Sequence, residues 1–384
     1  MKVAIVCDVL GKKNNGTTVA AYNLIEYLKS KGHEVIVLCP DKDKKGQEGF
    51  VILKTRYLGP INPILRRNGV SLAQPNRKLI ENTVKDCDVI HCMLPFISGH
   101  SACKTALKYN IPITSGFHAQ PENVTCHLGM ENIECVNRWI FKWFYNRVYK
   151  YMDAIHYPTQ FARDIFERIV GPTPGYVISN GVKSEVKHRD IPKPEKFKDK
   201  YVLFNVGRLC GEKAHMVALK AVEMSKYAKD IQLIFAGAGP LHDKIVKYAK
   251  KHLPVPLIID FLPRQEMLEI FNYADLYVHP GEVELESVAC LEAIVCGQVI
   301  IVSDSKNSAT KNFALSENNI FKCGNAEDLK NKIEYWIEHP KEKAEYKQKY
   351  LNYGENFDQQ ECMAKMEQMM FDVIEKKKNT CIKQ

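Results

Sequence analysis

Two cationic side chains that could hold a diphosphate follow an apolar run in the second half of the chain. The run Tyr201–Val206 has the length of a buried strand, and Arg208 and Lys213 come soon after it, five positions apart. Arginine offers a planar fork of N–H donors and lysine a mobile point charge, while a helix starting there would add free backbone amides. A solvated loop explains the same residues about as well, so both interpretations stay open.

A group of glutamates follows a second apolar run, Leu276–His279. Glu284 and Glu292 are eight positions apart, so the first is expected in a loop and the second a turn or two into a helix. Carboxylates in such places bind the hydroxyls of a sugar or a ribose well. Glutamates beside an apolar helix repel one another unless a hydroxyl-rich ligand, or Arg208 and Lys213, relieves the charge. Helix capping and surface charge are the alternative explanation.

Three further loops carry weaker signals. Phe235–Pro240 contains a G-x-G pair, but His242 takes the place of the third glycine of a dinucleotide fingerprint, which disfavours an NAD-type enzyme. Gly16 precedes a predicted helix, where backbone amides could approach a phosphate or a sugar, although a simple turn explains it equally well. Asp41–Asp43 fits the D-x-D pattern of some metal sites, but such short acidic patterns are usually solvated.

Alternating apolar runs and helical segments position these loops. Short continuous apolar runs separated by helices are typical of parallel strands buried on both faces. In the first half the runs are Lys2–Cys7, Glu34–Cys39, Val89–Met93 and Ile111–Ser115, with a predicted helix over 19–31 between the first two. In the second half they are Tyr201–Val206, Ile231–Ala236, Leu257–Phe261, Leu276–His279 and Val299–Ser303. Each half is therefore predicted to be an α/β, Rossmann-like domain.

A charged, proline-containing stretch with little apolar periodicity, residues 183–200, is predicted to be the linker between the halves. We assign 1–182 to the N-terminal domain and 201–357 to the C-terminal domain, and we predict an amphipathic helix over Glu361–Lys377. Ligands of open parallel sheets bind at the carboxyl ends of the strands. We therefore expect the site between the two domains.

Composition excludes several classes of protein. With 384 residues, 45% hydrophobic and 26% charged, the chain has enough apolar mass for two globular domains. No apolar stretch approaches the roughly 18 residues of a membrane span, and Asp8 interrupts the apolar start too early for a signal peptide, so we expect a cytoplasmic protein. The 13 cysteines include no Cys-x-x-Cys pair, which favours reduced core thiols. The net charge of +9 suits anionic substrates, lipid surfaces or nucleic acid, but no nucleic-acid-binding motif accompanies it.

Several motifs in the second half stand in the order typical of retaining GT-B glycosyltransferases, the large group 1 (family four) class that uses nucleotide-sugar donors. They are Gly207–Leu209 with Glu212–Lys213, Gly237–Pro240, Ala274–Pro280, and the E-x7-E segment from Glu284 to Glu292 that continues to Gly297. In the first half the matching residues are Gly16, Gly32–Val35, Phe117–Asn123 and Ile178–Val182. The chain thus resembles this family over nearly its whole length.

The resemblance implies the GT-B fold, in which two facing Rossmann-like domains enclose a deep cleft and a C-terminal helix, here about 358–384, crosses back to the first domain. It also implies a set of donor-binding residues: Gly16, Arg208, Lys213, Glu284, Leu285, Glu286, Ser287 and Glu292. Within this set, Arg208 and Lys213 hold the diphosphate and Glu292 binds the ribose hydroxyls. Glu284 binds the transferred sugar, and Gly16 lets the first loop approach the phosphate.

A retaining transfer without an enzymatic nucleophile needs the departing diphosphate stabilised while an oxocarbenium-like sugar forms. The acceptor then attacks from the face of the leaving group, and the leaving phosphate itself serves as base. The resemblance implies the catalytic residues His118, Arg208, Lys213 and Glu284, and on the acceptor side His118, Gln120, Glu122 and Asn123. For His118, a buried histidine held by backbone groups is the alternative. No metal or other cofactor is expected.

Some residues depart from the usual pattern of the family. Glu286 replaces an aromatic residue or Gln, Ala214 replaces Gly, Lys183 replaces Asp, and Ser305–Ser308 replaces a Gly-Gly turn near the sugar. Donor choice is therefore open. We expect a UDP-sugar, while GDP-sugars are used on the same scaffold.

The string Phe117–Asn123 most resembles the branch that includes diacylglycerol glucosyltransferases. We therefore expect a hexose, glucose or galactose, to pass from a UDP-sugar to a membrane lipid such as diacylglycerol or ceramide, giving an α-glycolipid. One alternative acceptor is a surface polysaccharide or another saccharide. A protein that only senses a nucleotide sugar is a further alternative, but such a sensor needs neither the two cations nor both carboxylates.

The segment Glu134–Met152 supports a membrane role independently. At about 100° per residue, Ile140, Phe141, Phe144 and Val148 share one side of a helix. The other side carries Arg138, Trp139, Lys142, Trp143 and Lys150. Tryptophan interleaved with cations is typical of a helix lying on an anionic leaflet, so we expect peripheral binding to the inner face of the cell membrane, with a second basic stretch at Arg66–Arg67 and Arg77–Lys78. Tryptophans packed on a neighbouring loop are the alternative.

Overall fold

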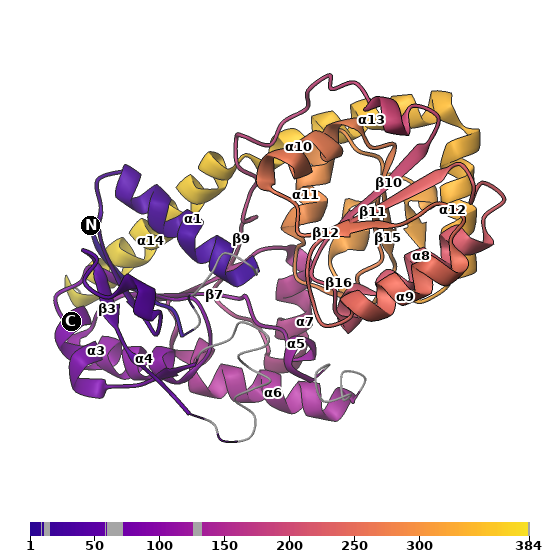
Figure 1. Ribbon diagram of the computed structural model, residues 1–384. Helices are drawn as coiled ribbons and strands as arrows, with labels where there is room; N and C mark the ends of the chain where they lie inside the picture. Colours follow the sequence, from indigo (N-terminus) through magenta and orange to yellow (C-terminus); the bar gives the residue numbers. More distant parts are fainter. Residues whose placement is uncertain (9, 11–15, 58, 60–71, 126–132, 383–384) are drawn as a thin grey trace. The chain divides into compact units, whose positions relative to one another are not determined.

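The computed structural model describes residues 1–8, 10, 16–57, 59, 72–125 and 133–382 (Figure 1). The chain forms two compact units: unit 1 is Met1–Asn180 with Gln360–Gln384, and unit 2 is Gly181–Gln359. Each unit is built around a parallel β-sheet with helices, which confirms the predicted α/β class.

The sheet of unit 1 has the strand order β3-β2-β1-β6-β7-β8-β9, with all neighbours parallel. The strands are β1 (Lys2–Val6), β2 (Glu34–Cys39), β3 (Phe50–Ile52), β6 (Val89–Cys92), β7 (Ile113–Gly116), β8 (Ala154–Tyr157) and β9 (Gly175–Val177). Every residue of β6, β7 and β8 is buried, as expected for apolar strands covered on both faces. The order reverses at β1, which pairs with β2 on one side and β6 on the other.

The C-terminal helix α14 (Gln359–Ile382) belongs to unit 1. Its Met363, Met366 and Met370 share a buried core with residues of β1 and α1, and the hydroxyl of Tyr27 donates to Glu367 Oε2 at 3.0 Å. In Figure 1 the helix lies beside α1, as predicted for a helix that returns to the first domain. The other helices of unit 1 are α1 (Gly16–Ser30), α3 (Arg77–Val84), α4 (Ile97–Tyr109), α5 (Glu122–Thr125), α6 (Glu134–Arg147) and α7 (Gln160–Val170).

The sheet of unit 2 has the order β12-β11-β10-β13-β15-β17, again parallel. The strands are β10 (Tyr201–Val206), β11 (Ile231–Ala236), β12 (Ile258–Asp260), β13 (Leu276–His279), β15 (Ile300–Ser303) and β17 (Ile320–Phe321). The helices are α8 (His215–Met224), α9 (His242–His252), α10 (Arg264–Tyr273), α11 (Val288–Val295), α12 (Ala326–Glu338) and α13 (Pro340–Gly354). The order reverses at β10, between β11 and β13. The carboxyl ends of strands at such a reversal are where open α/β sheets bind ligands.

The segment predicted as a linker, 183–200, packs against unit 2 instead of standing free. Val186 and Phe197 are buried in the core of this unit, and Lys193 forms an ion pair with Asp275 at 2.6 Å. Its few apolar residues are too widely spaced to show a period, but Val186 and Phe197 fill positions in the core. The division between the units falls at Asn180–Gly181, next to the predicted end of the N-terminal domain at residue 182.

Several other features of the sequence have structural explanations. Asp41 of the D-x-D pattern caps a short 3₁₀ helix, because its Oδ1 accepts from Asp43 N at 3.2 Å. Within the described ranges, no group of His, Cys, Asp and Glu is arranged to hold a metal. The cysteines described are free thiols, and most are buried.

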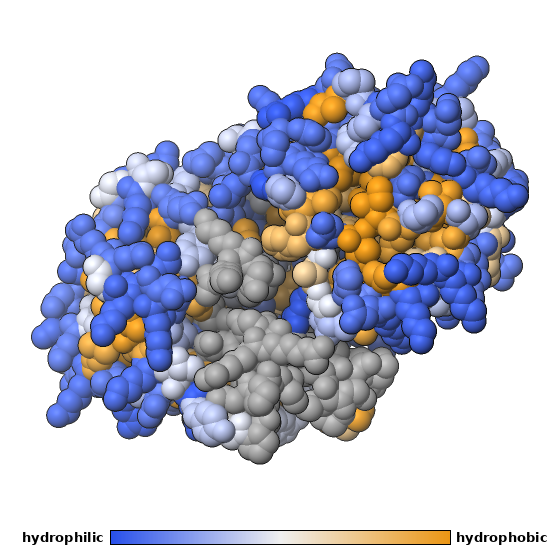
Figure 2. All heavy atoms as spheres, viewed as in Figure 1, coloured by the Kyte–Doolittle hydropathy of each residue, from blue (hydrophilic) through white to orange (hydrophobic). Residues whose placement is uncertain are grey.

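No helix among the described residues combines the length and the apolar character that crossing a bilayer needs. Figure 2 shows apolar side chains on the surface of unit 2 around the edge strand β12. Phe261, directly after this strand, is 73% exposed.

Candidate active site

The loop that carries Arg208 and Lys213 is held by the glycine loop after β11. Gly207 N donates to Ala236 O at 3.0 Å, and Leu209 N donates to Ala238 O at 3.1 Å. A Cβ atom at Gly237 would lie 1.9 Å from Gly207 O, and one at Gly239 would lie 2.4 Å from Leu209 O. The two glycines thus permit close backbone contact between the loops, which is a positioning role rather than a dinucleotide fingerprint.

Lys213 ends a short 3₁₀ helix, Gly211–Lys213, and the next residue turns the chain into α8. That residue, Ala214, has φ 48° in the left-handed region. Glycine adopts this conformation at lower cost, which explains why glycine is usual at this position in the family.

Lys213 meets Glu284 in a largely buried ion pair between the loops after β10 and β13. His279 Nε2 also lies 3.0 Å from Glu284 Oε1, and the hydroxyl of Tyr277 lies 3.3 Å from His279 Nδ1. The hydroxyl of Tyr277 also donates to Val206 O at 3.4 Å, and a proton on His279 Nε2 makes the imidazole the donor to the carboxylate. Gly281 leaves room for this contact, because a Cβ atom there would lie 2.8 Å from His279 Nε2.

This environment keeps Glu284 ionised. Burial raises the pKa of its carboxyl, but the charge of Lys213 and the hydrogen bond from His279 outweigh burial and lower the pKa to about 2. For Lys213, burial lowers the pKa of the ammonium and Glu284 more than restores it, so its pKa is raised. The site therefore holds a full positive and a full negative charge in a poorly solvated place.

A small parallel ladder fixes the backbone at Glu284. Strand β14 (Val283–Glu284) pairs with β16 (Asn307–Ser308), and Ala309 N donates to Glu284 O at 2.8 Å. Ser305 Oγ donates to Glu282 O at 2.6 Å. Asn307 and Ser308, within the stretch predicted to replace a Gly-Gly turn, thus form the partner strand of the segment that carries Glu284.

The other predicted donor residues lie around this cluster. Arg208 is partly buried in the loop after β10, Leu285 is partly buried and Glu286 is buried. Ser287 has φ 71°, and its hydroxyl lies 3.4 Å from His279 Nε2. The structure therefore brings the residues after β10 and β13 together, as the sequence predicts.

Glu292 has a partner that no motif of the sequence indicates. Arg264 Nη2 lies 2.7 Å from Glu292 Oε1, and Arg264 Nε lies 3.0 Å from Glu185 Oε1. Arg264 is the first residue of α10, just beyond the carboxyl end of β12. Its place after a strand is the same signal that singled out Arg208. His279, which orients Glu284, was named only as the end of a strand.

In unit 1, the start of α1 adjoins the loop after β7. The hydroxyl of Thr17, next to Gly16, donates to His118 O at 3.4 Å. Around Gly16, no described heavy atom would come within 4 Å of an added Cβ. The residue after Gly16 and the backbone of His118 are thus in contact within this unit.

His118 lies against two buried histidines. The rings of His118 and His156 are 5.5 Å apart, and burial, with His156 and His91, holds the pKa of His118 well below its usual 6.5. A Cβ atom at Gly116 would lie 2.4 Å from His118 Nε2, so the glycine at the end of β7 makes room for the ring. A neutral imidazole at this place can exchange hydrogen bonds but supplies no charge.

The other residues predicted on the acceptor side have different surroundings. Gln120 and Glu122 are buried, and Glu122 Oε1 accepts from Asn137 Nδ2 of α6 at 3.2 Å. Glu122 thus joins α5 to α6. Asn123 lies in α5, and its side chain is outside the described residues.

Helix α6 ends at Arg147, so Val148 and Lys150 of the predicted helical segment lie beyond it. On the predicted apolar side Phe141, Phe144 and Val148 are buried and Ile140 is partly buried. On the other side, Trp139 is 65% exposed and Trp143 is partly buried beneath the guanidinium of Arg147, 5.7 Å from its ring. Arg138, Lys142 and Lys150 are exposed. Of the second basic stretch, Arg66–Arg67 falls outside the described residues, and Arg77 and Lys78 begin α3.

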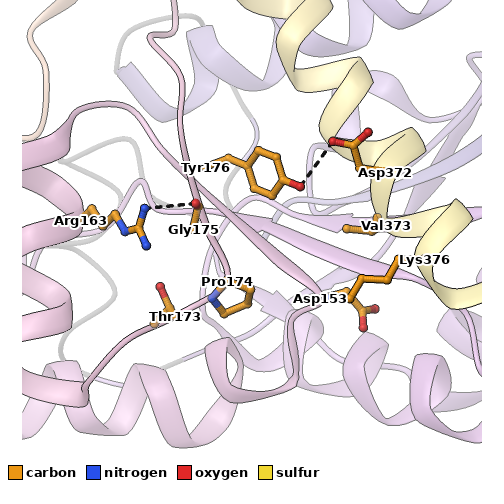
Figure 3. A pocket seen from close by; sticks show the side chains of 9 residues that line it. All are labelled: Asp153, Arg163, Thr173, Pro174, Gly175, Tyr176, Asp372, Val373 and Lys376. Carbon is orange, nitrogen blue, oxygen red and sulfur yellow. Dashed lines mark hydrogen bonds between the residues drawn. The ribbon is translucent and has the colours of Figure 1, made fainter. Parts of the chain in front are cut away.

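A cavity in unit 1 lies apart from the predicted residues. Asp153, Arg163 and Tyr176 line it together with Asp372 and Lys376 of α14 (Figure 3). Among the described residues that line it, none belongs to the predicted site. Its polar groups are used internally, since Arg163 Nη1 donates to Gly175 O at 3.3 Å and Tyr176 OH donates to Asp372 at 3.4 Å.

Two protein-family models match successive parts of the chain. "Glycosyltransferase Family 4" matches residues 14–186, and "Glycosyl transferases group 1" matches residues 186–355. The chain therefore belongs to the group 1 glycosyltransferases, and its solved structural neighbours have the GT-B fold. It is a glycosyl transferase. The predicted cleft between the two domains stays a prediction.

Similar proteins carry varied names. A GDP-mannose-dependent alpha-mannosyltransferase of Corynebacterium glutamicum is 24% identical over 77% of this chain and 71% of its own. A Campylobacter jejuni N-acetylgalactosaminyltransferase, named for a diphospho-undecaprenol acceptor, is 28% identical over 42% of this chain and 44% of its own.

Two solved structures are also similar. HepE of Anabaena, in complex with UDP and glucose, has a TM-score of 0.72 at 14% identity over 97% of this chain and 100% of its own. The catalytic domain of a cholesterol-alpha-glucosyltransferase from Helicobacter pylori is 39% identical over 41% of this chain and 99% of its own, with a TM-score of 0.38. The similarity of fold is judged from the HepE structure, which matches nearly the whole chain.

Proposed function

We propose that this glycosyltransferase moves a hexose, glucose or galactose, from a UDP-sugar to a membrane lipid such as diacylglycerol or ceramide, with retention of the anomeric configuration. One observation carries the donor side of the proposal. Lys213, Glu284 and His279 form a buried polar cluster at the carboxyl ends of β10 and β13, in the same loops as Arg208 and Ser287. Buried charges of this kind at a sheet reversal favour a ligand-binding role over a structural one.

The two cations stabilise the departing diphosphate. As the bond from the anomeric carbon to the phosphate oxygen breaks, negative charge grows on the diphosphate, where Lys213 and Arg208 supply fixed positive charge in a poorly solvated site. The acceptor hydroxyl forms the new bond from the same face. Its proton passes to the leaving phosphate, so no protein nucleophile is needed.

The carboxylates recognise the hydroxyls of the donor. Glu284, with its pKa near 2, is an acceptor of hydrogen bonds from the sugar at every physiological pH. Glu292 takes the ribose diol. On the acceptor side, the neutral imidazole of His118 orients the incoming hydroxyl next to Gly16 of α1, and no step needs a metal or another cofactor.

The exposed face of α6 supports a lipid acceptor. Trp139 with its cationic neighbours Arg138 and Lys142 has the composition that binds an anionic membrane surface. The diphospho-undecaprenol acceptor named for the Campylobacter jejuni relative also supports a lipid-linked substrate. We place the protein in the cytoplasm, bound peripherally to the inner face of the cell membrane.

One assay tests both the nucleotide of the donor and the identity of the acceptor. The purified protein is incubated with UDP- and GDP-sugars, each with vesicles of diacylglycerol, vesicles of ceramide, or soluble saccharides, and released nucleotide and product are measured. Glycolipid formed from a UDP-hexose, with the same anomeric configuration as the donor by NMR, supports the proposal. Transfer only from GDP-mannose or only to saccharides overturns the lipid or the UDP assignment, and an inverted product overturns retention.

A further inference from the structure

We propose that Arg264 is a positioning residue for nucleotide recognition, whose guanidinium holds the Glu292 carboxylate in the orientation that binds the ribose hydroxyls of the donor. The inference rests on the proposed function, in which Glu292 takes the ribose diol. It adds a residue that no motif of the family singles out in this sequence. The observation behind it is the 2.7 Å contact between Arg264 Nη2 and Glu292 Oε1.

The backbone of Glu292 is rigid, but its side chain needs a partner to fix it. Glu292 lies in α11 between Leu291 and Ala293, both fully buried. A glutamate side chain at such a position still has rotamer freedom, which a ligand would have to remove at its own cost. A hydrogen-bonded guanidinium removes that freedom before the ligand arrives.

Arg264 is itself anchored on both sides. Its Nε donates to Glu185 Oε1 at 3.0 Å while Nη2 reaches Glu292, so two carboxylates hold the planar fork. Burial lowers the pKa of Arg264, but the two carboxylates more than compensate and raise its pKa. The guanidinium is therefore a fixed charge, and the Glu292 side chain, 11% exposed, is not left as an uncompensated buried anion.

The contact leaves part of the carboxylate for a ligand. The hydrogen bond from Arg264 goes to Oε1, and the described contacts of the Glu292 side chain do not use Oε2. A ribose presents two neighbouring hydroxyl donors, which Oε2 and the second lone pair of Oε1 can accept. Arg264 and the ribose therefore do not compete for the same sites on the carboxylate.

A purely structural ion pair between α10 and α11 is the competing explanation, and deoxynucleotides distinguish the two. Affinities of UDP, 2′-deoxy-UDP and 3′-deoxy-UDP are measured by calorimetry for the wild type, Glu292→Gln, Arg264→Met and Arg264→Lys. The wild type is expected to prefer UDP by about tenfold over the analogue that lacks the bound hydroxyl, the worth of one hydrogen bond to a charged group. Glu292→Gln and Arg264→Met lose most of this preference, and Arg264→Lys recovers part of it.

The matched control is Arg163→Met, which removes another arginine–glutamate pair, to Glu167 at 3.0 Å, in unit 1 (Figure 3 shows Arg163). This variant is expected to keep the preference. If Arg264→Met binds all three nucleotides more weakly but keeps the full preference, the pair is structural and the inference is overturned. If Arg264→Met does not fold, the same ratio of affinities, for UDP relative to the deoxy analogue, is measured in Arg264→Lys and Glu185→Gln and decides between the two explanations.

Failure of the proposed function has a different signature. A wild-type protein that binds UDP but shows no preference over either deoxy analogue refutes the ribose role of Glu292, and this inference with it. If the wild type binds GDP rather than UDP, the same affinities are measured with GDP and its deoxy analogues. Arg264→Met is then still expected to lose the preference for GDP over the deoxy analogue. Binding of neither nucleotide refutes the donor site itself.

Discussion

The side chain of Lys213 forms an ion pair with that of Glu284, 71 positions further along the chain. The pair joins the loops after β10 and β13, the two strands that flank the reversal of the sheet order. In the unliganded protein each charge compensates the other. A donor with a diphosphate and a sugar offers both side chains new partners, so the cation and the carboxylate can be shared with the ligand without leaving either charge unpaired.

Replacing a cation of the donor loop should slow turnover strongly. We expect Lys213→Ala or Arg208→Ala to lower kcat by about two orders of magnitude or more, because each removes a fixed charge from the departing diphosphate. The measurement is nucleotide release under saturating donor. Lys220→Ala, an exposed lysine of α8, is the matched control and should leave turnover unchanged.

Loss of Lys213 also leaves Glu284 buried and unpaired, so stability must be separated from chemistry. The double variant Lys213→Ala with Glu284→Gln should regain much of the thermal stability lost in Lys213→Ala while staying inactive. Near-normal turnover in a well-folded Lys213→Ala variant would remove the lysine from the mechanism.

The ion pair also predicts how stability depends on pH. The pKa of Glu284 is lowered from 4.5 to about 2 in the folded protein, so the pair stabilises the fold above the ordinary pKa. This contribution, on the order of 3 kcal/mol, is lost as the pH falls from about 4.5 towards 2. In urea unfolding, the wild type should therefore lose free energy of unfolding more steeply than Glu284→Gln over that window. Parallel curves for the two proteins would show that Glu284 is not held ionised.

The contact between the glycine loop and the donor loop can be tested by adding one methyl group. Gly237→Ala places a Cβ atom 1.9 Å from Gly207 O, so the donor loop must shift, and we expect a lower melting temperature and at least tenfold weaker nucleotide binding, about the worth of one strong contact. The stability control is Gly211→Ala, where no described heavy atom lies within 4 Å of the added Cβ. Equal melting temperatures for the two variants would contradict the packing described.

The exposed face of α6 predicts binding to anionic membranes. Trp139→Ala combined with Lys142→Glu should reduce co-sedimentation with vesicles containing phosphatidylglycerol severalfold, because an interfacial aromatic ring and a cation are lost. Lys250→Glu makes the same charge change at an exposed position of α9 and should have little effect. If both variants lose co-sedimentation equally, net charge alone explains the binding. If neither variant loses it, α6 has no membrane role.

Much of the architecture follows from local patterns. Continuous apolar runs such as Tyr201–Val206 became buried parallel strands because a strand covered on both faces needs apolar residues at every position. The loops after such strands could also be singled out, since Arg208, Lys213 and Glu284 stand directly beyond strand ends. The two faces of α6 follow from helical periodicity alone.

Contacts between residues far apart in the chain could not be predicted from local sequence patterns. The charged segment 183–200 gave no sign that Val186 and Phe197 fill the core of unit 2, because single apolar residues carry no period. Arg264 and Glu292 are 28 positions apart, and only the packing of α10 beside α11 brings them together. In the sequence His279 is only the end of an apolar run, and the contact of its ring with Glu284 depends on the space that Gly281 leaves.

A crystal structure with a bound UDP-hexose shows whether unit 2 holds the donor diphosphate between Arg208 and Lys213. We expect phosphate oxygens within hydrogen-bond distance of both side chains, with the ribose at Glu292 and the sugar at Glu284. A nucleotide bound elsewhere, with the Lys213–Glu284 pair untouched, would exclude Arg208 and Lys213 as the groups that bind the diphosphate.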